Sequence, residues 1–237
     1  MTELSFHFPG EHLDAVIKAL MQLPAHLKPQ QFGYSEGIKN DKDMVADEKR
    51  FHAFLRKAAS GFFLYLENTV YSFRINKSGE FTVDADGINA EEASILLRHL
   101  GPVGASFAYA ADSAERKHRN RLIKNAEYGI HEAWVGRDWR RYIPGLYWLT
   151  LIPQSLADQH GVLLGELKKA AVEAEEIAPK LWLLRFFDAP ENWQVNAERL
   201  DEICSTTKGM FSITPVRTIF EKTTTFLGAA AVLREWS

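Results

Sequence analysis

The sequence has a single cysteine, Cys204, so no disulfide can form within its 237 residues. Chains without disulfides are typical of a reducing compartment. The first residues lack the basic and apolar segments of a secretory signal. No apolar run approaches the roughly 20 residues that a helix needs to cross a bilayer. We therefore expect a soluble, cytoplasmic protein with no membrane partner.

The sequence also lacks the short motifs that mark several classes of enzyme. It has no glycine-rich phosphate loop, no dinucleotide-binding glycine pattern and no nucleophile elbow. His131 and Glu132 begin the pattern of a helical zinc site, but Val135 stands where the second histidine would be. Cys204 lies on the apolar side of an expected helix, where a reactive thiolate is not favoured. We expect no metal, no cofactor and no catalytic residue.

Charge of one sign does not dominate the chain. The formal net charge is -3, with 28 Lys and Arg against 31 Asp and Glu. Residues 101–145 are basic, whereas the segments on either side are acidic. We interpret the most basic part, Glu115–Lys124, as the solvated face of a helix, because the acidic flanks oppose binding to phosphates. We expect no nucleic-acid partner.

The composition is that of a globular protein, with 46% hydrophobic and 12% aromatic residues. Alternating apolar residues predict strands, and apolar residues three or four positions apart predict helices. Strands are expected at residues 4–8, 32–34, 62–68, 69–76, 80–85, 103–110, 129–135, 146–152 and 181–188. Helices are expected at residues 11–23, 47–60, 90–100, 113–128, 155–171 and 189–207.

The order of these elements predicts an α+β fold, with a mixed, largely antiparallel sheet and helices packed on it. Asn89 is expected to cap a helix, and the link 76–79 is typical of a hairpin. No linker marks a boundary, so we expect one compact domain over residues 1–237. Each half can be interpreted as a strand-helix-strand unit with added strands. That leaves two related α/β halves open, although no repeat of fixed period supports a duplication.

An arginine-rich aromatic loop precedes the expected strand at 146–152. Tryptophan, tyrosine and arginine carry much of the binding energy in protein interfaces. The residues assigned to a partner surface in this loop are Arg137, Trp139, Arg140 and Tyr142. In the alternative, the rings pack under the following turn and the arginines pair with nearby acids. Both interpretations stay open.

The residues after this loop carry a resemblance to a known family. The stretch Tyr142–Gly161 resembles the central signature of bacterial polymorphic-toxin immunity proteins, including those paired with type VI secretion effectors. In that family, Pro-Gly, an aliphatic residue and Tyr-Trp-Leu lie mid-chain before a short apolar strand and a helix. The matching residues are Pro144, Gly145, Leu146, Tyr147, Trp148 and Leu149.

The resemblance implies a cytoplasmic protein that binds a cognate toxin and blocks it without catalysis. It carries over no catalytic residue and no cofactor. A turn followed by an apolar strand is core structure, so Pro144, Gly145, Tyr147 and Trp148 are expected to be structural. Only the loop before them is then a candidate for the toxin.

An acidic loop is a second candidate for the toxin surface. This loop lies around Glu36, Asp41, Asp43, Asp47 and Glu48. Its charges would mimic the substrate of a toxin that acts on nucleic acids or nucleotides, and would speed association with a basic toxin. Charges on a flexible loop change the association rate more than the affinity, whereas buried Trp and Arg side chains carry the affinity. We therefore expect the arginine-rich aromatic loop to anchor the toxin and the acidic loop to steer it.

A different class of function stays open as the alternative. It is a small α+β enzyme whose site is built from scattered residues, with His131, Glu132 and Arg137 as the candidates. The sequence does not indicate the oligomeric state.

Overall fold

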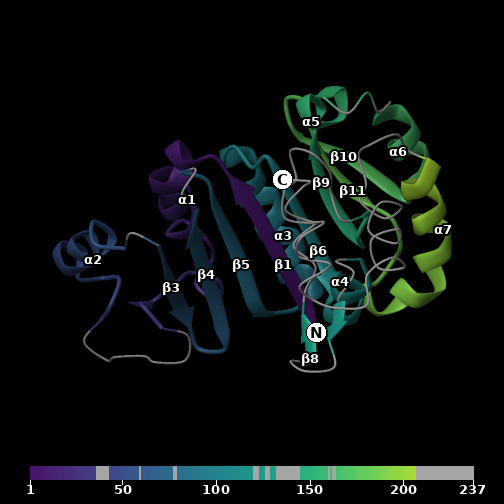
Figure 1. Cartoon of the computed structure of the whole chain (residues 1–237). Coiled ribbons are helices and arrows are strands. Elements are labelled where there is room, and N and C mark those ends of the chain that lie inside the picture. Colours follow the sequence, from purple (N-terminus) through teal and green to yellow (C-terminus); the bar gives the residue numbers. More distant parts are fainter. Residues whose placement is uncertain are drawn as a thin grey trace. The chain divides into compact units, whose positions relative to one another are not determined.

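The computed structural model describes residues 1–35, 43–58, 60–76, 79–119, 123–125, 129–131, 145–159, 161 and 164–206 (Figure 1). In these residues the chain is α+β, with a nine-stranded antiparallel open sheet, a separate two-stranded sheet and seven α-helices. The predicted fold class and the largely antiparallel sheet are confirmed. None of the described helices is long and apolar enough to span a membrane.

The strands of the large sheet are β1 (Thr2–Phe8), β2 (Gln31–Gly33), β3 (Gly61–Leu66), β4 (Thr69–Ile75), β5 (Phe81–Ile88), β6 (Phe107–Asp112), β9 (Leu149–Pro153), β10 (Glu173–Ala178) and β11 (Leu181–Arg185). The small sheet pairs β7 (Ile123–Asn125) with β8 (Gly129–His131). The α-helices are α1 (Leu13–Leu20), α2 (Glu48–Leu55), α3 (Ala90–Leu100), α4 (Ser113–Arg119), α5 (Gln154–Gln159), α6 (Leu164–Ala170) and α7 (Trp193–Thr206).

The chain divides into two compact units, and each is described here by itself. The first holds Met1–Ala110, Thr150–Pro153 and Glu175–Leu183, and therefore most of the large sheet. The second holds Ala111–Leu149, Gln154–Ala174 and Leu184–Ser237, and therefore α4 to α7. The expectation of a single domain over residues 1–237 stays a prediction.

The order of strands in the large sheet repeats a connection pattern. The order is β10-β11-β9-β6-β1-β5-β4-β3-β2. The chain runs from β1 through α1, then β2, α2 and β3, to the hairpin β4-β5 and then α3, and β5 pairs beside β1. It later runs from β9 through α5 and α6 to the hairpin β10-β11 and then α7, and β11 lies beside β9. The two runs share only part of this order, and the interpretation of two related halves stays a prediction.

One face of the sheet in the first unit is apolar and the other is polar. The register places Phe6 opposite Val83, and Val83 opposite Phe73, so their side chains share one face. All three residues are buried. On the other face, the Ser5 hydroxyl donates to Asp84 Oδ1 at 2.6 Å. An antiparallel sheet with one core face and one polar face gives this alternation.

Helices of the first unit cover the apolar face. α2 packs its Phe54 ring on Phe32 of β2 at 4.5 Å between centroids and on Phe62 of β3 at 5.8 Å. α3 contacts both β1 and α1. A capping box starts α3, because Asn89 accepts from the Glu92 amide while the Glu92 side chain accepts from the Asn89 amide. The predicted cap at Asn89 is therefore confirmed.

The expected helix at 113–128 is wrong in length and in exposure. α4 ends at Arg119, and β7 lies within the range predicted to be helical. Glu115 and Arg119 are buried, although a solvated face was expected. The two residues lie one turn apart and form an ion pair, which allows both charges to turn inward together.

Three further elements differ from the prediction. The strand expected at 146–152 begins only at Leu149, although Leu146, Tyr147 and Trp148 are buried as well. Helix 155–171 is divided into α5 and α6. β10 was missed because its sequence, EAEEIA, has too many charges for a buried strand; it is an edge strand of the sheet.

Candidate functional site

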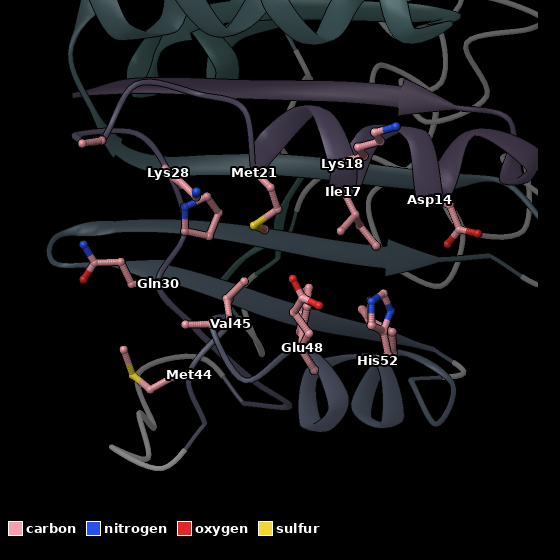
Figure 2. A pocket seen from close by; sticks show the side chains of 15 residues that line it. Asp14, Ile17, Lys18, Met21, Lys28, Gln30, Met44, Val45, Glu48 and His52 are labelled. Carbon is pink, nitrogen blue, oxygen red and sulfur yellow. The ribbon is translucent and has the colours of Figure 1, made fainter.

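A groove between α1 and α2 lies among the described residues and is open enough to receive a ligand. We call it the α1–α2 groove, and it is lined by α1, residues 25–30, residues 44–46 and α2. Its volume is about 840 Å³. All of these residues belong to the first unit, so the groove lies within one compact part of the chain. Figure 2 shows α1 on one side and α2 on the other.

Each helix contributes four side chains spaced as one stripe along its surface. α1 and its C-terminal cap contribute Asp14, Ile17, Lys18 and Met21. α2 contributes Glu48, Phe51, His52 and Leu55. Both sets follow the spacing i, i+3, i+4, i+7, which aligns side chains on one face of a helix. Both also alternate a polar and an apolar residue, so each wall carries charges beside hydrophobic side chains.

The bottom of the groove is apolar. Ile17, Pro29 and Phe51 are buried, and Met21 and Val45 are half-buried beside them. Phe51 is held there by its ring contact with Phe32 of β2, at 5.2 Å between centroids. The floor of the groove is therefore fixed by the packing of α2 on the sheet.

The rim of the groove is charged and exposed. Asp14 and Lys18 project from the α1 wall and Glu48 and His52 from the α2 wall, while Lys28 lies beyond the end of α1 (Figure 2). None of the lysines at the rim, nor Glu48, forms a salt bridge within the part of the chain that the structure describes. These charges are available to a ligand.

Met44 is the most exposed large apolar side chain of the groove, with 37% of its surface accessible. Tyr34 is 56% exposed nearby on the sheet side of α2, where its ring packs on Phe54 at 4.5 Å. Methionine adapts its shape to different partners and is frequent at binding surfaces. Met21 and Met44 both line the groove, which gives its two sides adaptable apolar contacts.

The structure places two residues of the predicted acidic loop next to this groove, and both have structural contacts. Asp47 is the N-cap of α2, since its side chain accepts from the Arg50 amide at 3.1 Å. Asp43 forms a salt bridge with Arg50 at 2.5 Å. Their carboxylates order the start of α2 as well as carrying charge, so a purely steering role does not describe them fully.

Several predicted site residues lie outside the described part of the chain. These are Glu36, Asp41, Glu132, Arg137, Trp139, Arg140, Tyr142 and Pro144. His131 is the last residue of β8. The proposed binding loop and the alternative catalytic residues therefore stay predictions.

In the second unit, a buried cluster of charged residues was not predicted. Arg119 Nε donates to Glu115 Oε1 at 2.9 Å, and Arg119 Nη1 donates to Asp201 Oδ1 of α7 at 3.1 Å. His118 Nε2 lies 3.2 Å from the other oxygen of Asp201. The i, i+4 spacing of Glu115 and Arg119 was the available signal, but it is equally common on solvated helices.

Two residues of the segment 145–149 contact this cluster. The Trp148 amide donates to Glu115 Oε2 at 3.3 Å. Gly145 lies against the Arg119 stem, and a Cβ there would come within 3.2 Å of Arg119 Cδ. Tyr147 and Trp148 are buried. Gly145 and Trp148 thus contact α4 rather than an open site.

Burial dominates the electrostatics of this cluster. It raises the pKa of Glu115 to about 7, although the Arg119 charge and the Trp148 amide both lower it. Two buried donors, Arg119 Nη2 and Trp148 Nε1, have no acceptor among the described residues. Such groups are costly to bury, so the ion pairs hold the segment in place without a large net gain.

Comparison with known proteins gave no match: no family model, no curated protein and no solved structure is similar to this chain. Within the described ranges, no group of three or more His, Cys, Asp or Glu side chains is placed to hold a metal ion. The candidate site therefore rests on its own geometry.

Proposed function

We propose that this chain is a cytoplasmic immunity protein that binds a bacterial toxin, such as a type VI or other polymorphic effector, and blocks it without catalysis. The observation that carries the proposal is the α1–α2 groove, with its apolar floor and charged rim. Protein interfaces combine an apolar centre with a polar rim in this way. The resemblance of Tyr142–Gly161 to immunity proteins supports the same function.

Neutralisation by binding requires affinity and no chemistry of its own. A toxin that is held in a tight complex loses access to its substrate, or is locked in an inactive shape. The apolar floor supplies desolvated contacts, which carry affinity, and the rim supplies charges, which select the partner and speed association. The arginine-rich aromatic loop adds a second contact in this proposal.

Co-expression with the toxin tests this function. Candidate toxic domains, taken from genes that neighbour the one for this chain, are produced in cells with and without the chain, and growth is measured. The purified pair is then tested for a stable complex by size-exclusion chromatography. We expect protection and a stoichiometric complex. Killing that is unchanged by the chain, together with no complex, would show the proposal to be wrong.

The same assay separates binding from the enzymatic alternative. The double variant His131→Ala, Glu132→Gln removes the candidate acid-base groups of that alternative. An immunity protein that acts by binding alone should protect cells as well as the parent does. Protection that is lost while the complex still forms would instead favour catalysis by these residues.

A further inference from the structure

We propose that the α1–α2 groove receives one amphipathic α-helix of the toxin, with an acidic flank toward α1 and a basic flank toward α2. This inference rests on the proposed function. The proposed partner is a helix that carries apolar residues at i, i+3 or i+4, and i+7 on one side. Helices commonly bind hydrophobic grooves with residues at that spacing.

The walls of the groove favour a helix over an extended peptide. Both walls are helical stripes of the same spacing, Asp14 to Met21 and Glu48 to Leu55. Ridges of side chains on a third helix can interdigitate with such stripes on both sides. A peptide that binds by adding a strand would need a free strand edge, and the groove is lined by helices and connecting segments.

The helical layer of the first unit has room at this place. α1 contacts α3 on one side, as neighbouring helices on a sheet do. On its other side, α1 faces α2 across the groove, and about 840 Å³ lies between them. The Ile17 and Phe51 side chains close the floor. A docked helix would therefore extend an existing layer over an apolar base.

The charges at the rim set the chemistry of the flanks. Lys18 and Lys28 outnumber Asp14 on the α1 side, and Glu48 stands beside His52 on the α2 side. A helix with glutamate or aspartate toward the lysines and lysine or arginine toward Glu48 would pair with both walls. The reverse helix would place like charges together, which costs affinity. The rim thus selects one orientation of one kind of helix.

Variants at the mouth and rim of the groove test the docking directly, with the toxic domain that the co-expression assay identifies as the probe. Met44→Glu places a charge at the mouth of the groove, and Lys18→Glu with Glu48→Lys reverses the flanks. Val195→Glu is the matched control, because Val195 is 88% exposed on α7. Each variant is first shown by circular dichroism to be folded. We expect the groove variants to raise Kd at least tenfold and the control to leave it unchanged.

A cross-link identifies the bound segment. Cys204 is buried, so Met44→Cys introduces one accessible thiol among the described residues, which is labelled with benzophenone. After irradiation with the toxic domain, mass spectrometry locates the linked peptide. We expect an amphipathic helix with opposite charges on its two flanks. A link to a loop or strand, or a helix with the opposite charge order, overturns the inference.

The outcomes separate this inference from the proposed function. If the parent protects cells and binds the toxin, but the groove variants do so equally well, the docking site is wrong and the function stands. If the parent neither binds nor protects, the function fails, and the groove proposal that rests on it fails with it. A dimer that Met44→Glu disrupts, or a small molecule that co-purifies in the parent alone, overturns the helix as occupant.

Discussion

The buried ion pair between α4 and α7 gives the sharpest prediction for the stability of the second unit. In the variant Arg119→Met, the unbranched side chain keeps most of the stem that lies against Gly145 but loses the charge. Glu115 and Asp201 then lose their shared cation. Removing one partner of a buried ion pair costs about 3–5 kcal/mol, because the remaining charge is uncompensated. We expect the free energy of unfolding of the variant to be lower than that of the parent by this amount at pH 8.

The difference in unfolding free energy between parent and variant should be smaller at pH 5. Arg119 lowers the pKa of Glu115, so its removal raises that pKa further above the value of about 7 in the parent. At pH 5, Glu115 then holds a proton in the folded variant, and the uncompensated charge is reduced. Urea unfolding of parent and variant at both pH values, with equal m values, measures the difference. A loss under about 1 kcal/mol at pH 8, or an equal loss at both pH values, would refute this account of the cluster.

Four further predictions follow from particular side chains. Burial raises the pKa of Glu115 from its ordinary value of 4.5 to about 7 in the folded chain. Its protonation therefore adds stability that is complete below about pH 4.5 and lost as pH rises through 7, by about 3 kcal/mol in all; Glu115→Gln should flatten the unfolding free energy over that range. Trp148→Ala should cost about 3–5 kcal/mol in urea unfolding, and an unchanged midpoint would contradict its burial. Asp47→Ala should cost about 1 kcal/mol, because the cap of α2 is lost, whereas Asp47→Asn should cost less. Trp139→Ala with Arg140→Ala should raise the dissociation rate of the toxin at least tenfold, about 1.4 kcal/mol, in surface plasmon resonance; parent-like kinetics would remove this loop as an anchor.

The elements that the sequence predicted well are those fixed by local chemistry. α3 has the predicted bounds, because Asn89 caps it and Gly101-Pro102 follows it. The strands β4 and β5 alternate apolar and polar residues, because one face of the sheet is core and the other is polar. These elements could be predicted without knowledge of tertiary contacts, because their own residues determine both the periodicity and the ends of each helix or strand.

The errors occurred where distant contacts decide the outcome. Glu115 and Arg119 resemble a solvated helical pair, and their burial depends on Asp201 and on the Trp148 amide, which are far away in the chain. The acidic segment EAEEIA gives no apolar alternation. It becomes a strand because it pairs at the edge of the sheet, where Glu173 also reaches Arg185. Neither contact can be predicted from the local propensity of the segment.

The α1–α2 groove was missed for a related reason. Its two stripes each alternate a polar and an apolar residue, so neither helix appears unusual in the sequence. Any surface helix has some side chains that face the core and others that face solvent, so such a stripe is not distinctive. The groove exists because Phe51 packs on Phe32 and holds α2 over β2, while α1 lies beside α3. The separation of the two helices therefore comes from the width of the sheet beneath them. A binding surface of this kind becomes visible only when the sheet order is known, whereas a catalytic motif is visible in the sequence because chemistry constrains the residue types themselves.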